Sequence, residues 1–237
     1  MRQPGGAESP CGPIRPDPVR QLFAPGADAL FRLAIATGVF GLAALPVVGA
    51  GLVRSSYVTG VGVALEQPVP FSHKHHSGEL GIDCRYCHTT VETQATAGLP
   101  PTHTCMTCHS QIWSGSAMLE PVRASLARDE PLRWQRLNKL PGYVYYNHAV
   151  HVGNGIGCST CHGAVTDMQL TYRANAFEMS FCLDCHRNPE KYVRPKDRIL
   201  DMTWTPPANQ AEIGPELVRQ YHIRGGERLT ECAICHR

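Results

Sequence analysis

The stretch that decides the fold reads Phe71-Ser72-His73-Lys74-His75-His76 at residues 71–76 and Cys84-Arg85-Tyr86-Cys87-His88 at residues 84–88. Its second part has the pattern Cys-x-x-Cys-His, which attaches c-type haem. Two thiols three positions apart can form thioethers to the two vinyl groups of one haem, and the adjacent His can ligate the iron. The first part supplies histidines that could reach the other face of the iron.

The Cys-x-x-Cys-His pattern occurs five times, and we number these motifs first to fifth in chain order. The predicted thioether cysteines are Cys84, Cys87, Cys105, Cys108, Cys158, Cys161, Cys182, Cys185, Cys232 and Cys235. The predicted proximal iron ligands are His88, His109, His162, His186 and His236. The sequence therefore predicts five covalently bound c-type haems.

Zinc is the main alternative, because Cys-x-x-Cys motifs also build zinc ribbons and knuckles. Only 12 of the 237 residues are His, so chance would place His after all five motifs with odds on the order of 10⁻⁷. Zinc sites also combine such motifs in pairs that complete four ligands, and five is an odd number. The pattern favours haem.

Composition narrows the compartment and the class of partner. Haem attachment uses ten of the 11 cysteines, which excludes a disulfide framework and leaves Cys11 as an incidental cytoplasmic thiol. Covalent haem attachment implies maturation outside the cytoplasm. Haem propionates move the formal charge of +2 to about −3 in the holoprotein. The sequence has no basic run or aromatic-interleaved patch, so we expect no nucleic-acid partner.

Residues 33–53 are free of charge and lie between Arg32 and Arg54. As a helix, this length spans a bilayer core of about 30 Å. The alternative is a cleaved signal peptide with Val48-Gly49-Ala50 as the cleavage site, but the run is longer than the apolar region of a typical signal peptide. The arginines before the run place the N-terminus in the cytoplasm by the positive-inside rule. They are Arg2, Arg15, Arg20 and Arg32.

These features predict a four-part chain: a cytoplasmic segment over 1–32, a transmembrane anchor over 33–53, a linker over 54–70 and a periplasmic pentahaem domain over 71–237. About 170 residues must cover five haems in that last part. The expected fold is therefore a multihaem cytochrome c with one transmembrane helix and a haem-packed domain of loops and short helices, with little sheet. We expect short helices over 117–128 and 215–222, and an extended segment over 143–146.

An internal repeat organises the haem domain. A His-x-x-His pair precedes the first motif by 11 residues and the third motif by 10 residues. A further motif follows each pair, so the repeat units cover about 71–112 and 146–188. The fifth motif, at about 215–237, resembles a truncated third copy. Duplication of a two-haem unit is the simplest explanation.

Seven histidines outside the motifs are candidates for the distal face of the irons. In small multihaem cytochromes of the cytochrome c3 type, which this pattern resembles, the first His of His-x-x-His ligates the haem that follows and the second reaches a neighbouring haem. The resemblance implies distal ligands at His73, His76, His148 and His151, and spacing adds His222 for the fifth haem. We interpret His75 as a hydrogen-bond partner and His103 as a solvated loop residue.

Methionine offers a second kind of distal ligand, because a thioether can replace the distal His of a c-type haem. The candidates are Met179, most plausibly for the fourth haem, and Met118. The competing interpretation is that five histidines already fill the five distal positions and both methionines only pack.

Nearly the whole chain resembles the pentahaem cytochrome subunit of bacterial alternative complex III. The resemblance rests on the anchor, the five motifs and three stretches: Gln67-Pro68-Val69-Pro70 before the first His-x-x-His, Pro100-Pro101-Thr102 before the second motif, and Asn147-His148-Ala149-Val150-His151 before the third. It implies a respiratory or photosynthetic quinol:acceptor oxidoreductase in the cytoplasmic membrane. Its partners would be an iron–sulfur subunit, quinol-oxidising membrane subunits and a further cytochrome.

The expected role is electron conduction rather than catalysis, toward an external acceptor such as a small cytochrome c or a copper protein. Two alternatives stay open. A multihaem reductase would need an open distal position, and many of its motifs replace the proximal His by Lys, which none does here. A stand-alone membrane-anchored quinol dehydrogenase carries a ligating Met soon after its first motif, whereas here Thr89-Thr90 follows His88.

Overall fold

The computed structural model describes residues 23–24 and 26–236. Within this part, helices and loops make up the fold, and strand-like pairing is limited to four isolated bridges. The bridges join Val61 to Arg173, Ala64 to Tyr172, Val144 to His236 and Ile156 to Val193. The predicted fold class of short helices with little sheet is confirmed. The thiol predicted to be cytoplasmic, Cys11, lies outside the described residues.

The chain divides into two compact units, residues 1–51 and 52–237. In chain order the elements are α1 (Ala27–Arg54), α2 (Ser56–Thr59), the π-helix η1 (Lys74–Glu79), α3 (Cys84–Cys87), α4 (Thr102–His109), η2 (Ala117–Leu119), α5 (Glu120–Arg128), α6 (His148–Gly153), α7 (Cys158–His162), η3 (Val165–Asp167), α8 (Met179–Arg187), η4 (Pro189–Lys191), η5 (Lys196–Arg198), α9 (Gln210–Gln220), α10 (Gly226–Leu229) and α11 (Cys232–Cys235).

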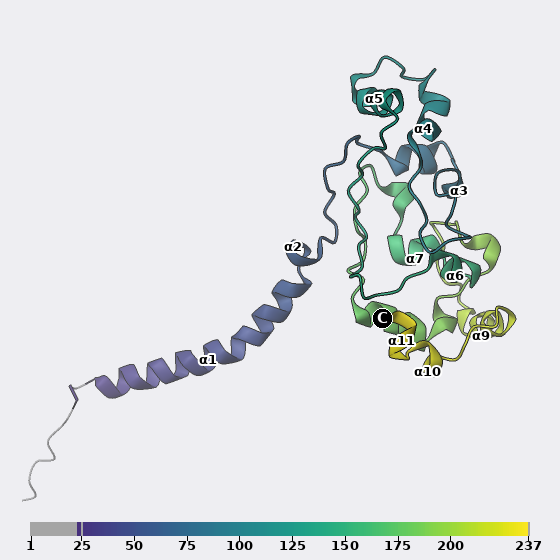
Figure 1. Cartoon of the computed structure of the whole chain (residues 1–237). Helices are drawn as coiled ribbons and strands as arrows, with labels where there is room; N and C mark the ends of the chain where they lie inside the picture. The colour runs from purple at the N-terminus through teal and green to yellow at the C-terminus, as the bar shows by residue number, and fades with distance from the viewer. Residues whose placement is uncertain (1–22, 25, 237) are drawn as a thin grey trace, which may run out of the picture. The chain divides into compact units, whose positions relative to one another are not determined.

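The first long element, α1, contains the apolar run 33–53. Its 28 residues include an 18-residue window with a mean hydropathy of 2.0, and none of that window is buried. In the described part of the chain it is the one helix long and apolar enough to cross a membrane. Pro46 lies inside it, as membrane helices tolerate. This helix is a candidate membrane span (Figure 1).

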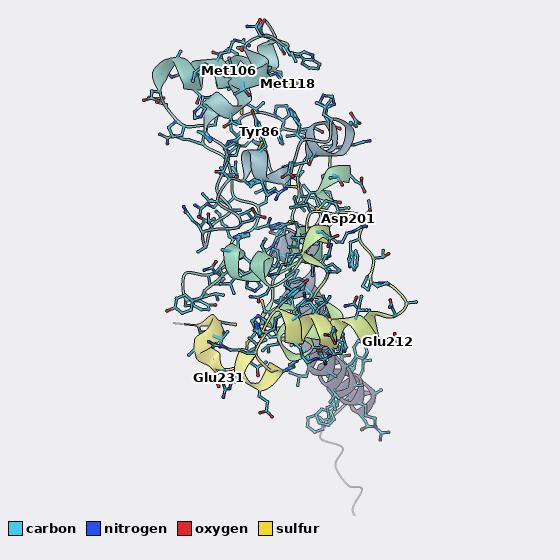
Figure 2. All side chains as sticks on the ribbon, turned by 90° about the vertical axis from the view of Figure 1, so that its right-hand side faces the viewer. Tyr86, Met106, Met118, Asp201, Glu212 and Glu231 are labelled. Atoms are coloured by element: carbon cyan, nitrogen blue, oxygen red, sulfur yellow. The ribbon has the colours of Figure 1, made fainter. Side chains whose placement is uncertain are left out.

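In the second unit, the helices that carry the motifs succeed one another along the domain. Figure 1 shows α4 and α5 at one end, α10 and α11 at the other, and α6 and α7 between them. Figure 2, turned by 90°, shows the same order, with Met106 and Met118 at the end opposite Glu212 and Glu231. The motifs are therefore spread along the domain rather than gathered at one point.

Six of the nine buried apolar side chains of the described residues form two small clusters. One contains Val69, Leu119 and Val122, with Cys105 and Met106 packed against it. The other contains Val91, Val152 and Ile199, with Cys158 packed against it. Each cluster has one motif cysteine packed against it, so the second and third motifs lie against the small hydrophobic core of the chain. Such small clusters fit a fold whose bulk is completed by a bound prosthetic group.

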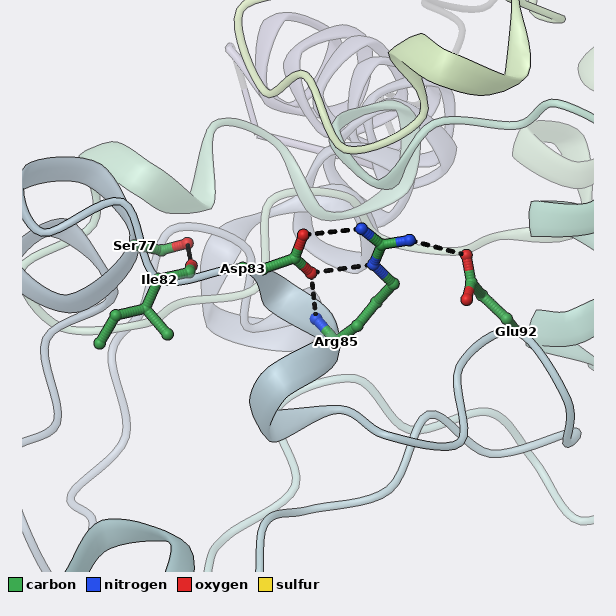
Figure 3. A network of polar contacts seen from close by, with 5 residues as sticks. All are labelled: Ser77, Ile82, Asp83, Arg85 and Glu92. Carbon is green, nitrogen blue, oxygen red and sulfur yellow. Dashed lines mark hydrogen bonds and ion pairs between the residues drawn. The ribbon is translucent and has the colours of Figure 1, made fainter. Parts of the chain in front are cut away.

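Local capping explains where the motif helices begin. Asp83 is the N-cap of α3, and its carboxylate accepts a 2.8 Å hydrogen bond from the backbone N–H of Arg85. The same carboxylate accepts two bonds from the Arg85 guanidinium, which also reaches Glu92 at 3.5 Å (Figure 3). Asn147 caps α6 through a 3.3 Å bond from the backbone N–H of Val150. These caps fix the starts of the first motif and of the second His-x-x-His.

One predicted helix begins earlier than expected. Instead of starting at Pro215, α9 starts at Gln210 and has Pro215 in its interior. Tertiary contacts hold this first turn: the Gln210 side chain donates to the carbonyls of Glu190 and Val193, at 2.8 and 3.0 Å. Gly214 also packs so closely on the Glu190 carbonyl that a Cβ would lie 2.0 Å from its oxygen. Proline is common in the first turn of a helix, which is why the sequence predicted a start at Pro215. The contact with η4 extends the helix toward the N-terminus, to Gln210.

Candidate haem-binding sites

Four pairs of histidine rings lie at nearly the same centroid separation. Their ring centroids are 6.5 Å apart for His73 and His88, 6.1 Å for His76 and His109, 6.3 Å for His148 and His162, and 6.2 Å for His151 and His186. A metal–imidazole bond of about 2 Å on each side, plus about 1 Å from nitrogen to ring centre, gives a separation of about 6 Å. The residues therefore fit an iron between the rings of each pair.

Each of these eight rings has its Nδ1 atom in a hydrogen bond. The Nδ1 atoms of six rings donate to backbone carbonyls: His76 to Ser72, His88 to Gly98, His109 to Ile112, His148 to Ala95, His151 to Asn147 and His186 to Leu229. His73 bonds the Thr171 hydroxyl at 2.7 Å, and His162 bonds the Asn138 side-chain amide at 3.1 Å. A carbonyl acceptor requires a proton on Nδ1, so Nε2 is the nitrogen that remains for a metal.

The two His-x-x-His segments share one pattern of aromatic packing, although the first lies at the start of the π-helix η1 and the second in the α-helix α6. The Phe71 ring packs edge-on against His73 at 4.9 Å and face-on against His76 at 4.4 Å. Tyr146 makes the same contacts with His148 at 4.7 Å and with His151 at 4.5 Å. In both repeats, one aromatic ring two residues before the pair fixes both histidines. No role was assigned to these aromatics from the sequence, and their shared position two residues before each pair is the signal that could have found it.

Burial lowers the pKa of four of the paired histidines and favours their neutral form. Desolvation, with smaller contributions from His88, His76 and His162, lowers the pKa of His73 to about 4. Desolvation likewise lowers the pKa of His162 to about 4, with contributions from His148 and His88. The pKa values of His76 and His151 are also lowered, mainly by burial. Neutral imidazole is the form that ligates a metal, so these rings are ready to bind at neutral pH.

The thiols show which motifs are neighbours. Burial raises the pKa of seven motif cysteines, and in five of them the next contribution comes from a cysteine of another motif. These pairs are Cys87 with Cys105, Cys158 with Cys84, Cys161 with Cys182, Cys185 with Cys161, and Cys182 with Cys235. The motifs therefore follow one another in space in the order second, first, third, fourth, fifth.

The fifth motif differs from the other four. Among the described rings, the one that packs near His236 is that of Tyr143, at 5.9 Å and 28°. The neighbouring backbone is tied to the same segment, because the Tyr145 N–H donates to the Cys235 carbonyl at 2.7 Å. His222, the predicted distal ligand, is exposed and follows α9 with a left-handed φ of 54°. Its assignment stays a prediction.

The remaining candidates lie at the surface. Met118 is 50% exposed in η2, and Met179 is 60% exposed at the start of α8. His75 bonds Glu79 at 2.9 Å, in keeping with its interpretation as a hydrogen-bond partner. The loop predicted at His103 is wrong, because α4 already begins at Thr102, although the residue is exposed as expected.

The described side chains do not form a zinc cluster. In that part of the chain, no three His, Cys, Asp or Glu side chains come close enough together to hold one metal ion. The ten motif cysteines are all free of disulfides.

The backbone acceptors of the Nδ1 bonds could not be found from the sequence. The carbonyls of Ala95, Gly98 and Leu229 orient paired histidines that lie 10 to 53 residues away. Every residue offers such a carbonyl, so residue type carries no signal for this role. Only the folded chain identifies which of them accept.

Comparisons with known proteins agree with this geometry. Residues 144–237 match the family of cytochrome c7 and related cytochromes c, and residues 53–132 match the class III cytochrome c family. The chain is also 30% identical, over 144 residues, to the menaquinone reductase multihaem cytochrome c subunit of Nitratidesulfovibrio vulgaris. That match covers 52% of this chain and 69% of that protein. With its five Cys-x-x-Cys-His motifs and paired histidines, the chain belongs to the multihaem cytochromes c.

Proposed function

We propose that this chain is a membrane-anchored pentahaem cytochrome c that conducts electrons within a quinone-linked oxidoreductase complex. The observation that carries the proposal is the set of four histidine pairs, each with a separation that fits an iron, on neighbouring attachment motifs. Bound haem would supply the one-electron chemistry. The chain itself sets the spacing of the sites and the ligands and surroundings that tune them.

The geometry supports one ligand assignment for four of the haems. His73 with His88 would hold the first, His76 with His109 the second, His148 with His162 the third, and His151 with His186 the fourth. A thioether ligand is then not needed at the fourth haem, which agrees with the exposure of Met179. In the proposed assignment, the second His of each His-x-x-His serves the later motif of its own repeat.

The spatial order of the motifs supports a conducting role. Five sites that follow one another along a domain form a row with two ends, which suits transfer between two partners. The second motif, on α4, is at one end, and the fifth motif, on α11, is at the other (Figure 1). A catalytic reductase would instead need one haem with an open face and proton-donating side chains around it.

The finer placement is part of the same proposal. Residues 1–32 would lie in the cytoplasm, 33–53 in the membrane, 54–70 in a linker and 71–237 on the periplasmic side, with repeat units over about 71–112 and 146–188 and the fifth haem over about 215–237. The apolar helix and the arginines before it support this topology. The resemblance to alternative complex III supports an iron–sulfur subunit, quinol-oxidising membrane subunits and a further cytochrome as partners.

A second candidate concerns the direction of electron flow. The relative's name describes a menaquinone reductase, whereas the resemblance to alternative complex III implies quinol oxidation and an external acceptor. Both functions need the same row of sites. They differ in which end is supplied with electrons, so the distinction must be made on the assembled complex.

The test is purification of the native complex from detergent-solubilised membranes through a tag on this chain. We expect several copurifying subunits, five haems per chain by pyridine haemochrome, and rapid haem reduction on addition of a menaquinol analogue. Haem oxidation by an added quinone, with no reduction by quinol, would instead support the menaquinone reductase. An isolated chain that quinol reduces directly would support the stand-alone quinol dehydrogenase and contradict the proposal.

A further inference from the structure

A buried arginine outside the ligand set lies against the third motif. Arg194 is only 3% exposed, although it is charged and carries the longest cationic side chain. Its backbone N–H donates to the Gly155 carbonyl at 2.9 Å, and the preceding Val193 bridges to Ile156. This short antiparallel pairing brings the side chain to the start of α7, where the third motif begins.

The guanidinium binds the two residues between the motif cysteines. One terminal nitrogen donates to the Ser159 hydroxyl at 3.2 Å and to the Thr160 hydroxyl at 2.9 Å. The other donates to the Asp201 backbone carbonyl at 3.1 Å. Gly157, which precedes Cys158, makes the approach possible, because a Cβ there would lie 2.1 Å from the guanidinium carbon. The glycine is therefore required for the arginine to sit at the motif.

The positive charge of Arg194 has no ion pair among the described residues. The nearby Asp201 carboxylate is taken by the Arg198 guanidinium and by the N–H and hydroxyl of Thr203. The Nε atom of Arg194 is buried without a hydrogen-bond partner. Its guanidinium carbon lies 5.4 Å from the centre of the Trp204 ring, a cation–π contact that stabilises the charge only partly.

Burying an unpaired charge is costly, so such a group needs an explanation. Desolvation lowers the pKa of Arg194, but a guanidinium keeps its proton in proteins and the charge persists. A fastening role alone would be served by a neutral side chain that donates hydrogen bonds. What a neutral side chain cannot supply is a fixed positive charge beside the third motif, which is central in the row of five.

We propose that Arg194 is a positioning residue for redox potential, which raises the reduction potential of the haem held by Cys158, Cys161 and His162 above that of its neighbours. Reduction adds one electron to that site and lowers its charge by one, with no proton needed at Arg194. A fixed positive charge nearby favours the state with the added electron, and burial keeps water from screening it. The inference rests on the proposed haem site at the third motif.

The experiment uses the purified complex and three variants of the full chain. Arg194→Met removes the charge and keeps the stem, and Arg194→Lys keeps the charge without the planar fork. Arg198→Met is the matched control: Arg198 lies 5.7 Å from the same Trp204 ring, but its side chain is 51% exposed and is paired with Asp201. Spectroelectrochemical titration measures the five potentials, and pyridine haemochrome counts the haems.

We expect Arg194→Met to lower the reduction potential of one haem by ~59 mV, which corresponds to a tenfold change in a one-electron reduction equilibrium. The other four potentials should stay in place, Arg194→Lys should keep most of the wild-type value, and Arg198→Met should move none. Five haems with unmoved potentials in Arg194→Met would overturn the inference. An equal fall in Arg194→Lys would also overturn it, because hydrogen bonding rather than charge would then be responsible.

A further variant covers the case in which Arg194→Met fails to mature. Arg194→Gln removes the charge and keeps a side-chain amide that can donate to Ser159 and Thr160, so it should lower the same potential, and an unchanged potential would overturn the inference. Failure of the proposed function is distinguishable from both results. Fewer than five haems in the wild-type chain would contradict the haem assignment itself, whereas five haems with unmoved potentials contradict only the role of Arg194.

Discussion

Each repeat has an inner histidine pair, which contains the first His of its His-x-x-His, and an outer pair, which contains the second. The angle between the ring planes is similar in the two inner pairs and different in the two outer pairs. The rings of His73 and His88 are 7° from parallel, and those of His148 and His162 are 4° from parallel. The outer pairs diverge, with 66° between His76 and His109 and 20° between His151 and His186. The repeated segment thus reproduces one geometry closely and leaves the other free to change.

The difference follows from what each outer histidine contacts. His109 bonds the Ile112 carbonyl three residues later, so its own turn orients it at the end of the row. His186 bonds the Leu229 carbonyl, 43 residues away, in the segment that leads to the fifth motif. The inner pairs instead lie near each other. His162 contributes to the lowered pKa of His73, and His88 contributes to the lowered pKa of His162. Neighbouring structure, rather than the repeated sequence, therefore sets the outer rings.

The largest expected effect comes from breaking an inner pair. In His148→Ala, the thioethers of the third motif should keep the haem while the iron loses its distal ligand. Five haems should still be counted, a high-spin component should appear, and quinol-driven electron transfer should fall more than about tenfold. His73→Ala should behave alike, because the two inner pairs share one geometry.

His75→Ala is the matched control for these variants, since His75 is exposed, its imidazole bonds Glu79, and it contacts neither His73 nor His148 in the ring pairs of the described residues. Its spectrum and transfer rate should stay at the wild-type level. A purely low-spin spectrum in both inner variants would contradict the assignment of His73 and His148 as ligands.

A smaller effect separates histidine from methionine at the fourth haem. His151→Ala should create a high-spin component, whereas Met179→Leu should leave the visible and near-infrared spectra unchanged, because the Met179 side chain is exposed. Spectra of the oxidised proteins measure both outcomes. A sulfur-to-iron charge-transfer band that disappears in Met179→Leu would show that Met179 is the ligand after all.

The aromatic ring of each His-x-x-His should contribute to stability rather than to conduction. Tyr146→Leu removes ring contacts with His148 and His151 and should cost about 1 kcal/mol of unfolding free energy. Phe71→Leu should cost a similar amount, because its contacts are the same. Thermal unfolding of the holoproteins measures both, and Tyr146→Phe, which keeps the ring, serves as the control. Equal losses in Tyr146→Phe and Tyr146→Leu would contradict a role for the ring.

The smallest effect is spectroscopic. Axial imidazole planes that are nearly parallel split the two iron d orbitals that they overlap, whereas crossed planes leave these orbitals close in energy. The 66° between His76 and His109 should therefore give the second haem a low-spin EPR signal at lower field than the first, third and fourth haems. His76→Ala should remove that signal alone. Loss of a signal shared with the other haems would show that the outer pair of the first repeat is not distinct.

The sequence by itself determined the features that are local in the chain. A haem-attachment motif needs only five consecutive residues, so the five motifs, and with them the predicted thioether cysteines and proximal histidines, could be read directly. The class of fold followed, because so little protein around so many motifs leaves room only for loops and short helices. The apolar run of α1 was equally visible, since membrane crossing depends on length and composition.

Only the tertiary structure decided which residues meet. The opposite face of each iron has no covalent tie to its motif, so the sequence could suggest His76 and His151 without saying which motif each one faces. The backbone carbonyls that orient the rings and the buried charge of Arg194 carry no sequence signal either. All of these depend on segments that are far apart in the chain and are brought together by burial and hydrogen bonding. The predicted attachment motifs can therefore be read from the local sequence, whereas the proposed ligand pairs and the proposed role of Arg194 depend on the folded chain.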